Sequence, residues 1–360
     1  INMKEKLTFL GIETSCDETA AAVVRDKSDG TGEILSNVVS SQVEEHKEFG
    51  GVVPELAARA HVEKIDFIIK KAIKESNIDL KNINGIASTA GPGLIVCLTV
   101  GLNAGKAMAG VLNKPFVAVN HLEGHALSPK INEKIKFPYL LLLISGGHTQ
   151  FLEVKAVNKY KRIGTTIDDA LGEAFDKTAK ILGLGYPGGP QIEKFAKLGN
   201  KNSYDLPEPI INRAGCNLSL AGLKTAVLRK SKELSSNKEK YNLAASFQET
   251  INKILTKKTK VAMEKFREEI SSNSLRPFVV AGGVAANETI RKNLKELSKK
   301  MDFNPIFPSK EFCGDNAAMI AWAGIQRYKK RLFNVKNDLV RSRWPLDADA
   351  PFLKGPGLKL

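Results

Sequence analysis

The sequence has 360 residues, of which 42% are hydrophobic, a length and composition that predict a large core and two domains. It has no unbroken apolar run of about 18 residues, and Ile1 to Lys6 lead directly into a predicted strand, so we expect no membrane span and no secretory leader. The four cysteines lie far apart, which excludes a disulfide framework, and the net charge of +15 favours a polyanionic partner. These features predict a cytoplasmic location, with the mitochondrial matrix as the less favoured alternative.

The first third of the chain predicts three antiparallel strands followed by alternating helices and strands. A tight polar turn separates the first two predicted strands, and a stripe that includes Leu56, Ile65 and Ile69 predicts the first long helix. The expected elements are strands at 8–15, 19–25 and 32–41, a helix at 54–76, a strand at 83–89, a helix at 94–112 and a strand at 115–120. This alternation is typical of a layered α/β domain.

The same order of elements then begins again, which predicts an internal duplication of the fold. A strongly apolar strand at 139–145 is followed by a strand at 149–157, and a later strand at 277–281 enters a helix near Asn287. Helices are expected between them at 167–182, 189–198, 221–234 and 241–270, with a loop at 200–216. We therefore predict an N-terminal lobe at 1–135, a C-terminal lobe with helical insertions at 136–332 and an extended tail at 333–360.

Basic residues are concentrated in the predicted helical block. Residues 221–300 contain 18 Lys and Arg against 8 Glu and no Asp, a charge of +10 from less than a quarter of the chain. Such a block predicts a basic helical face for the phosphates of a nucleic acid. A solvated surface on a lysine-rich protein explains the composition equally well, so both interpretations stay open.

Two histidines provide the sharpest candidate for a metal site. His121 and His125 are one helical turn apart and share a helix face, whereas Glu123 between them points to the opposite side. The spacing is not HExxH, in which a glutamate beside the first histidine is the base of a zinc protease. A third ligand is needed, and Asp315, at a predicted helix start, is the best candidate. The alternative is a helix-capping aspartate and two packed histidines.

Glycine pairs after buried strands predict turns that a phosphate could approach. Gly146-Gly147 and Gly282-Gly283 would expose backbone N–H groups, because glycine has no Cβ. Asp169, Glu173 and Asp176 share a predicted helix face and could contact a ribose or a cation. Each feature alone also fits a plain turn or a solvated acidic face. No GxxxxGK[ST] loop is present, which excludes a P-loop protein.

Ten motifs, in order from about residue 8 to residue 345, resemble those of the TsaD family of tRNA threonylcarbamoyladenosine transferases. They are LGIETSCDET at 10–19, GGVVPELAARAH at 50–61, TAGPGL at 89–94, NHLEGH at 120–125, ISGGHTQ at 144–150, GEAFDKTAK at 172–180, YPGG at 186–189, GLKT at 222–225, AGGVAAN at 281–287 and FCGDN at 312–316. Together these motifs cover nearly the whole chain.

The resemblance implies an α/β fold of the actin-like, sugar-kinase-like (ASKHA) type, with two duplicated lobes around a nucleotide cleft. It implies transfer of the threonylcarbamoyl group of threonylcarbamoyl-AMP to N6 of adenosine 37 in tRNAs that read codons beginning with A (t6A37). The implied ligands of one divalent metal, Fe2+ or alternatively Zn2+, are His121, His125 and Asp315, with Glu13 as a catalytic residue near the reacting centre. The implied donor contacts are Leu143, Ile144, Ser145, Gly146, Gly147, Asp176, Gly189 and Asn287.

Several positions depart from the family pattern, and two of them concern the implied site. Leu143 stands where archaeal and eukaryotic relatives have a metal-ligating tyrosine, so water or substrate must complete the coordination. Glu193 stands where many relatives have aspartate, which leaves its ribose contact open. Bacterial relatives depend on a paralogous partner, TsaB, and an ATPase, TsaE, whereas the mitochondrial branch acts as a homodimer. We expect the bacterial type, with a homodimer as the alternative.

Three other classes of protein fit less well. A metalloprotease, the older label of this family (O-sialoglycoprotein endopeptidase), lacks the HExxH geometry. An actin-like kinase would need a base for acceptor phosphorylation, which the sequence does not supply, and a scaffold would not need metal ligands and nucleotide turns together. The nearest competitor is a carbamoyltransferase of the same fold that acts on a small molecule, against which the basic block favours nucleic acid.

Overall fold

The computed structural model describes residues 6–270, 275–333 and 339–351. Internal contacts divide the chain into unit 1 (Ile1–Lys136, Ala156–Tyr160 and Asp315–Ala348) and unit 2 (Phe137–Lys155, Lys161–Gly314 and Asp349–Leu360). The chain therefore leaves unit 1 after Lys136 and returns to it twice. The predicted lobes at 1–135 and 136–332 are each one continuous stretch of sequence, unlike these units, and they stay a prediction. The tail predicted at 333–360 lies partly outside the described residues.

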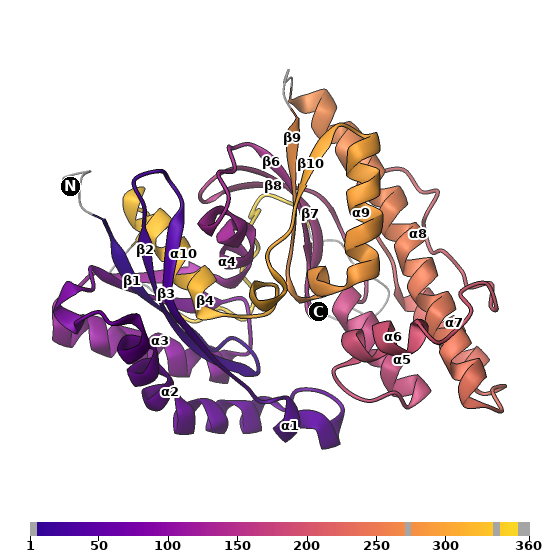
Figure 1. Cartoon of the computed structure of the whole chain (residues 1–360), viewed down its shortest axis with the longest axis horizontal. Coiled ribbons are helices and arrows are strands. Elements are labelled where there is room, and N and C mark those ends of the chain that lie inside the picture. Colours follow the sequence, from indigo (N-terminus) through magenta and orange to yellow (C-terminus); the bar gives the residue numbers. More distant parts are fainter. Residues whose placement is uncertain (1–5, 271–274, 334–338, 352–360) are drawn as a thin grey trace. The chain divides into compact units, whose positions relative to one another are not determined.

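Unit 1 contains a five-stranded sheet in the order β3-β2-β1-β4-β5 within the described residues (Figure 1). β1 (Thr8–Glu13), β2 (Glu18–Asp26) and β3 (Gly32–Ser41) pair antiparallel. β4 (Gly85–Gly91) pairs parallel with β1, and β5 (Phe116–Asn120) pairs parallel with β4. The predicted antiparallel meander and the parallel strands after it are confirmed.

Helices cover both faces of this sheet. α2 (Pro54–Ser76) and α3 (Ile95–Leu112) pack on one face, and α10 (Ala317–Lys329) packs on the other (Figure 1). The shorter helices are α1 (Val43–His46), η1 (Lys47–Phe49), η2 (Leu80–Asn82), α4 (His121–Leu127) and η3 (Ser128–Ile131). Because strand side chains alternate between faces, Leu10 and Ile12 join the core with α2 and α3, whereas Gly11 faces α10.

α3 is long and apolar enough, by composition, to cross a membrane, although Thr99, Asn103 and Lys106 interrupt its apolar residues. Such a helix is weak evidence for a membrane span, because core helices share this composition. The contacts of α3 support a core helix, since Gly101 and Gly105 allow it to approach the sheet closely. A Cβ on Gly101 would lie 2.4 Å from the Thr14 hydroxyl, and one on Gly105 would lie 2.1 Å from the Ser88 hydroxyl.

Unit 2 repeats the strand order of unit 1. Its described sheet has the order β10-β9-β6-β7-β8, in which β6 (Tyr139–Ile144) pairs antiparallel with β7 (Thr149–Ala156) and parallel with β9 (Arg276–Ala281). β10 (Phe303–Ile306) pairs parallel with β9, and β8 (Lys159–Thr165) is the other edge strand. The helices are α5 (Leu171–Leu182), α6 (Gly188–Ala196), α7 (Ala221–Ser231), α8 (Asn237–Glu269), η4 (Gly283–Ala286), α9 (Glu288–Lys300) and η5 (Lys310–Phe312). The predicted duplication of the fold is therefore present in the topology.

Two edge strands were not predicted, and one helix begins later than predicted. β8 contains three basic residues, and β10 contains a proline, so neither has the apolar alternation of an inner strand. The helix predicted from residue 167 begins at Leu171. The side chain of Asp168 accepts hydrogen bonds from the main-chain N–H groups of Leu220 and Ala221, so it caps α7 instead of entering a helix.

Candidate metal centre

The helix that carries the two histidines begins directly at the end of a strand. β5 ends at Asn120, whose side-chain oxygen accepts hydrogen bonds from the main-chain N–H groups of Leu122 (2.9 Å) and Glu123 (3.4 Å) and so caps α4. Every residue of α4 is buried. The rings of His121 and His125 lie on one face with centroids 4.8 Å apart, as the four-residue spacing predicts.

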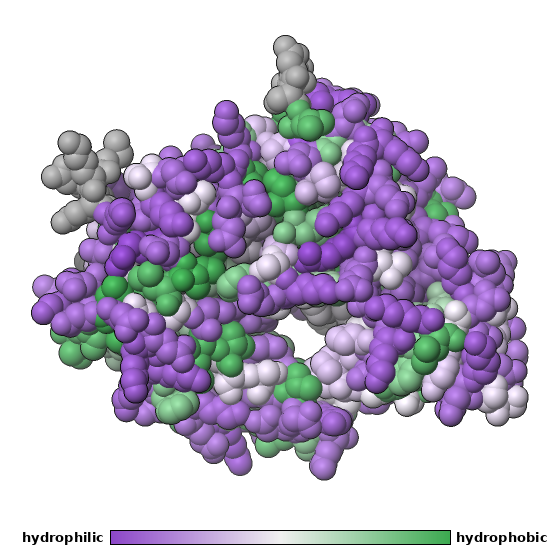
Figure 2. Space-filling model, viewed as in Figure 1, coloured by the Kyte–Doolittle hydropathy of each residue, from purple (hydrophilic) through white to green (hydrophobic). Residues whose placement is uncertain are grey.

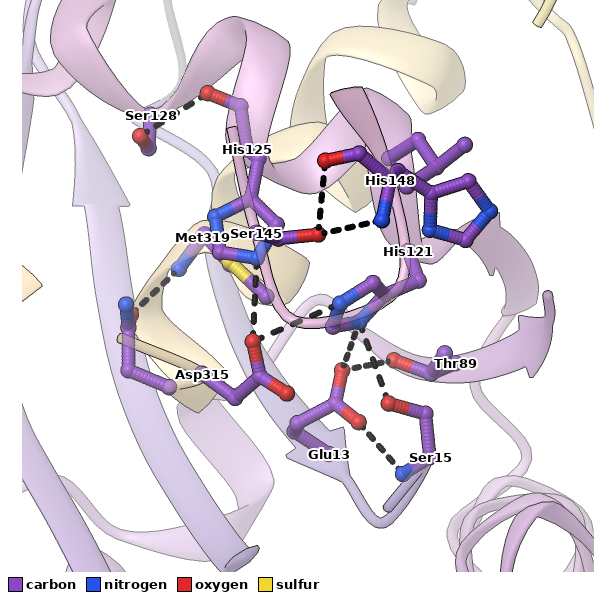
Figure 3. A network of polar contacts seen from close by, with 12 residues as sticks. Glu13, Ser15, Thr89, His121, His125, Ser128, Ser145, His148, Asp315 and Met319 are labelled. Atoms are coloured by element: carbon purple, nitrogen blue, oxygen red, sulfur yellow. Dashed lines mark hydrogen bonds and ion pairs between the residues drawn. The ribbon is translucent and has the colours of Figure 1, made fainter. Parts of the chain in front are cut away.

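The structure brings Asp315 to this pair of histidines (Figure 3). Its Oδ1 atom lies 3.4 Å from Nε2 of His121 and 3.0 Å from Nε2 of His125. One ligand atom from each of the three side chains lies within 4.8 Å of the others. The three residues predicted as metal ligands therefore converge within unit 1, although Asp315 lies 190 positions beyond His125.

Glu13 contacts this group through the other nitrogen of His121. Nδ1 of His121 lies 3.0 Å from a carboxylate oxygen of Glu13, and the same oxygen accepts a hydrogen bond from the Thr89 hydroxyl (2.6 Å). Ser15 donates its main-chain N–H to the second oxygen, and its hydroxyl lies 3.2 Å from the same Nδ1 (Figure 3). A proton held on Nδ1 by Glu13 leaves Nε2 free to coordinate a metal.

Ser15 and Thr89 were not among the predicted site residues, but the topology explains why they lie at this site. β1, β4 and β5 are parallel, so their carboxyl ends meet at one edge of the sheet, where ligands bind in open α/β sheets. Polar residues at three successive strand ends, Glu13 with Ser15, Thr89, and Asn120 with His121, are the signal that would have revealed them.

In this cluster the carboxylates of Glu13 and Asp315 and the imidazole of His121 stabilise each other's charged forms. Burial lowers the pKa of His121, but the carboxylates of Asp315 and Glu13 raise it well above its usual value. Burial raises the pKa of Asp315, and the two histidines more than reverse this, so the pKa lies far below its usual range. Burial likewise raises the pKa of Glu13, and His121 brings it below the usual value. The site therefore contains two carboxylates that favour a positive charge between them.

The donor set fits a divalent transition metal. Two imidazoles and one carboxylate are ligands of both zinc and iron sites. The two Nε2 atoms point to the same carboxylate oxygen, and Nδ1 of His125 is buried without a hydrogen-bond partner within the described part of the chain. The His121, His125 and Asp315 group could therefore hold a metal ion.

The predicted donor contacts all belong to unit 2. Leu143 and Ile144 are fully buried in β6, so only their main chain is available near the strand end. Gly146 and Gly147 are exposed in the turn that follows, with open space at both Cβ positions. The main-chain N–H of Ser145 donates to the carbonyl of His148 (2.8 Å), which closes this turn.

Glycine contacts and hydrogen bonds fix the backbone around the other predicted donor residues. Gly282 has φ +97°, and a Cβ there would lie 2.4 Å from the Ile144 carbonyl, so the ends of β6 and β9 touch. The main-chain N–H of Gly188 donates to Asp176 (2.7 Å), which fixes the start of α6 beside α5, and Gly189 next to it has open space. Asn287 caps α9 through the N–H of Ile290 (3.0 Å).

The predicted acidic stripe is partly neutralised by lysines. Asp169 forms ion pairs with Lys177 (3.0 Å) and Lys224 (2.9 Å), and Glu173 pairs with Lys177 (2.6 Å). Of the three acidic residues in the stripe, Asp176 is the one that was predicted to contact the donor. Glu193, whose ribose contact was left open, accepts a hydrogen bond from the main-chain N–H of Glu288 (2.7 Å) at the start of α9.

The fold and the site together define a class, an actin-like (ASKHA) α/β protein with a His-His-Asp group that could hold a metal. Its fold is similar to that of full-length HypF in a phosphate- and nucleotide-bound form, with a TM-score of 0.58 and 13% identity over 91% of this chain and 47% of that chain. At this identity the similarity concerns the fold alone.

Relatives similar in sequence identify the family. A protein of Pelagibacter ubique (strain HTCC1062) named tRNA N6-adenosine threonylcarbamoyltransferase is 61% identical over 99% of this chain and 100% of its own length. A protein of the same name from Sinorhizobium medicae (strain WSM419) is 51% identical over 98% of both chains. The model of the family "TsaD: tRNA N6-adenosine threonylcarbamoyltransferase" matches residues 33–322. The chain belongs to the TsaD family of tRNA N6-adenosine threonylcarbamoyltransferases, as the ten motifs predicted.

Proposed function

We propose that this chain transfers the threonylcarbamoyl group of threonylcarbamoyl-AMP to N6 of adenosine 37 in tRNAs that read codons beginning with A, and that it does so with one divalent metal held by His121, His125 and Asp315. Membership of the TsaD family over nearly the full length of the chain carries the proposed reaction. The convergence of the three ligands in unit 1 supports the metal. Fe2+ is the proposed ion and Zn2+ the alternative.

The chain's own residues would prepare the metal and its ligands. A bound metal would supply Lewis-acid polarisation of the acyl carbonyl of the donor. Glu13 holds a proton on Nδ1 of His121 and so orients the imidazole. Glu13 is only 1% exposed, and its contact with His121 supports a role that acts through this imidazole. The predicted role of Glu13 as a catalytic residue near the reacting centre is also part of the proposal.

For the adenylate of the donor we propose the predicted contacts in unit 2. The exposed turn at Gly146 and Gly147 offers main-chain N–H groups to a phosphate. Gly189 lies in the first turn of α6, the end of a helix that favours an anion. Asp176, in the middle of α5, and Asn287, the N-cap of α9, complete the set with Leu143, Ile144 and Ser145.

The basic block is the proposed contact for the tRNA backbone. Many of its Lys and Arg side chains are exposed on α7, α8 and α9, and the surface over α8 and α9 is mostly hydrophilic (Figure 2). The exposed basic residues are Arg229, Lys230, Lys232, Lys238, Lys253, Lys257, Lys260, Lys265, Arg267, Lys292, Lys295, Lys299 and Lys300. Contacts of this kind weaken with salt, because binding releases counterions from the nucleic acid.

A TsaB-like paralogue and a TsaE-like ATPase are the proposed protein partners, with a homodimer as the alternative. We also propose that the reaction takes place in the cytoplasm.

An apolar surface of α2 and α3 supports a protein partner. Phe67 and Val62 of α2 are 63% and 64% exposed, and Ile95 and Val96 of α3 are 52% and 47% exposed. Exposed apolar patches of this kind mark protein interfaces.

Phe67→Lys should therefore weaken association with the TsaB-like partner by about tenfold or more, since a charge in an apolar interface is desolvated without a counter-ion. Isothermal titration of the variant with the partner measures the change. Leu275→Lys is the matched control, because Leu275 is also 63% exposed but belongs to unit 2. Equal binding by the Phe67 variant and the wild type would remove this face from the interface.

Mass analysis of nucleosides tests the reaction itself. Unmodified tRNA is incubated with this protein, threonylcarbamoyl-AMP and Fe2+ or Zn2+, with and without the TsaB-like and TsaE-like proteins. We expect threonylcarbamoyladenosine, and a rate that falls as salt rises. Formation by the chain alone would establish self-sufficiency, and formation only with partners would establish a complex. Absence under both conditions would favour the carbamoyltransferase that acts on a small molecule.

A further inference from the structure

A buried carboxylate lies between the two histidines but plays no part in the proposed coordination. Glu123 is 1% exposed and faces away from His121 and His125. A charged carboxylate in such surroundings is unstable unless its oxygens are paired. In this protein both oxygens of Glu123 have partners, which come from two distant segments of unit 1.

The first partner is Arg327, in the last turn of α10. Its Nη1 atom lies 2.7 Å from Oε2 of Glu123, and the side chains of both residues are largely buried, at 12% and 1% exposed. The other oxygen, Oε1, accepts hydrogen bonds from the main-chain N–H of Asn158 and from the hydroxyl of Tyr160, each at 2.8 Å. Asn158 and Tyr160 belong to Ala156–Tyr160, the short segment with which the chain first returns to unit 1.

The ion pair joins the two helices that carry the candidate metal ligands. α4 carries His121 and His125, and Asp315 lies two residues before the first residue of α10. The helices also touch directly, since a Cβ on Gly124 would lie 2.9 Å from a side-chain atom of Ile320 in α10. The spacing of the three ligands therefore depends on how α4 lies along α10. Because coordination tolerates errors of only about 0.2 Å, a small shift of α4 would separate the imidazoles from Asp315.

We propose that Glu123 and Arg327 are positioning residues whose buried ion pair fixes α4 against α10 and thereby sets the spacing of the His-His-Asp group for a divalent transition metal. Asn158 and Tyr160 hold the same carboxylate from its other side. This inference rests on the proposed metal site. It gives a role to Glu123, the carboxylate of the His-Leu-Glu-Gly-His motif, which faces away from the ion and cannot coordinate it.

The test is the affinity of the purified protein for Zn2+, measured by competition with a fluorescent chelator. Glu123→Gln keeps the shape of the side chain and removes its charge. We expect it to bind Zn2+ about tenfold or more weakly than the wild type, the size of effect usual for residues that support metal ligands. Hydrogen exchange in the presence of chelator should also show faster exchange of the α4 amides, independently of any metal.

Asp26→Asn is the matched control. Asp26 is also buried and pairs with Lys329, two residues beyond Arg327, but it joins α10 to β2 instead of α4. We expect this variant to lose stability while its Zn2+ affinity and the exchange of its α4 amides stay as in the wild type. Equal losses of Zn2+ affinity in both variants would indicate general destabilisation and overturn the proposal.

The wild type and His121→Ala separate this inference from the proposed metal site. If the wild type binds Zn2+ and His121→Ala does not, the metal site stands, and unchanged affinity in Glu123→Gln overturns the positioning role alone. If the wild type does not bind, the metal site fails and the positioning role fails with it. Should Glu123→Gln not fold, Tyr160→Phe removes one donor to Glu123, and an affinity equal to that of the wild type would then overturn the proposal.

Discussion

Asp315→Ala and His121→Ala are each expected to abolish threonylcarbamoyl transfer to tRNA while the protein stays folded. Each change leaves only two of the three converging ligands, and two donors do not close a metal site. Asp315 also supplies the one oxygen on which both Nε2 atoms converge. Metal content, circular dichroism and the rate of threonylcarbamoyladenosine formation should be measured on the same preparations.

Glu311→Ala is the control for the metal prediction. Glu311 is an exposed carboxylate four residues before Asp315 in the same connection, so its removal tests whether any local loss of charge reduces activity. We expect wild-type metal content and rate. Chelation of the wild type should likewise stop the reaction, and Fe2+ or Zn2+ should restore it. Full activity of either ligand variant would exclude the assigned ligands.

Gly11→Ala is expected to destabilise the protein by about 3 kcal/mol, the upper end of the usual effect of overpacking a core. A Cβ on Gly11 would lie 2.3 Å from the carbonyl oxygen of Ala317 and 2.6 Å from the main-chain nitrogen of Ala321. Both atoms belong to the backbone of α10, so the whole helix must move away from β1. Because Asp315 lies only two residues before this helix, weaker metal binding should accompany the loss of stability.

Urea unfolding of Gly11→Ala and Gly110→Ala measures this effect. Gly110 lies in α3, and beyond the helix's own nearby backbone no atom lies within 4 Å of its Cβ position, so alanine there should be neutral or stabilising, as alanine is the better helix former. Equal unfolding free energies for Gly11→Ala and the wild type would show that α10 can shift freely on the sheet.

Local patterns in the sequence predicted the inner strands, the long helices and the repeat of the fold. Their apolar signal is strong, because β1 and β6 are buried along their whole length as nearly continuous apolar runs and α2 is buried along one stripe. The edge strands β8 and β10 were not predicted, because an edge strand need not have alternating apolar and polar residues. The four-residue spacing predicted that His121 and His125 share a face, because that relation depends only on helix geometry.

Contacts between distant segments were beyond this kind of prediction. The pairing of His121 with Glu13 spans 108 positions, and that of Glu123 with Arg327 spans 204. No periodicity within a segment determines which residue of another segment it meets. Asp315 was found only because a carboxylate at a helix start is a plausible ligand, whereas Arg327 had no such signal. The ion pair of Asp169 with Lys224, 55 positions away, was unforeseen for the same reason, whereas the pair of Glu173 with Lys177 is a local contact within α5.

The order in which the chain visits its two units has a consequence for protein synthesis. Unit 1 begins at the N-terminus, but α10, whose residues Ala317 to Ile325 are all buried, comes near the end of the sequence. A ribosome therefore completes the sheet of unit 2 before it releases the helix that covers β1. Until then one face of the first sheet lacks its cover and the two histidines lack Asp315. A nascent chain that stops before residue 315 would expose that apolar face and hold an incomplete ligand set, so metal loading should follow chain completion.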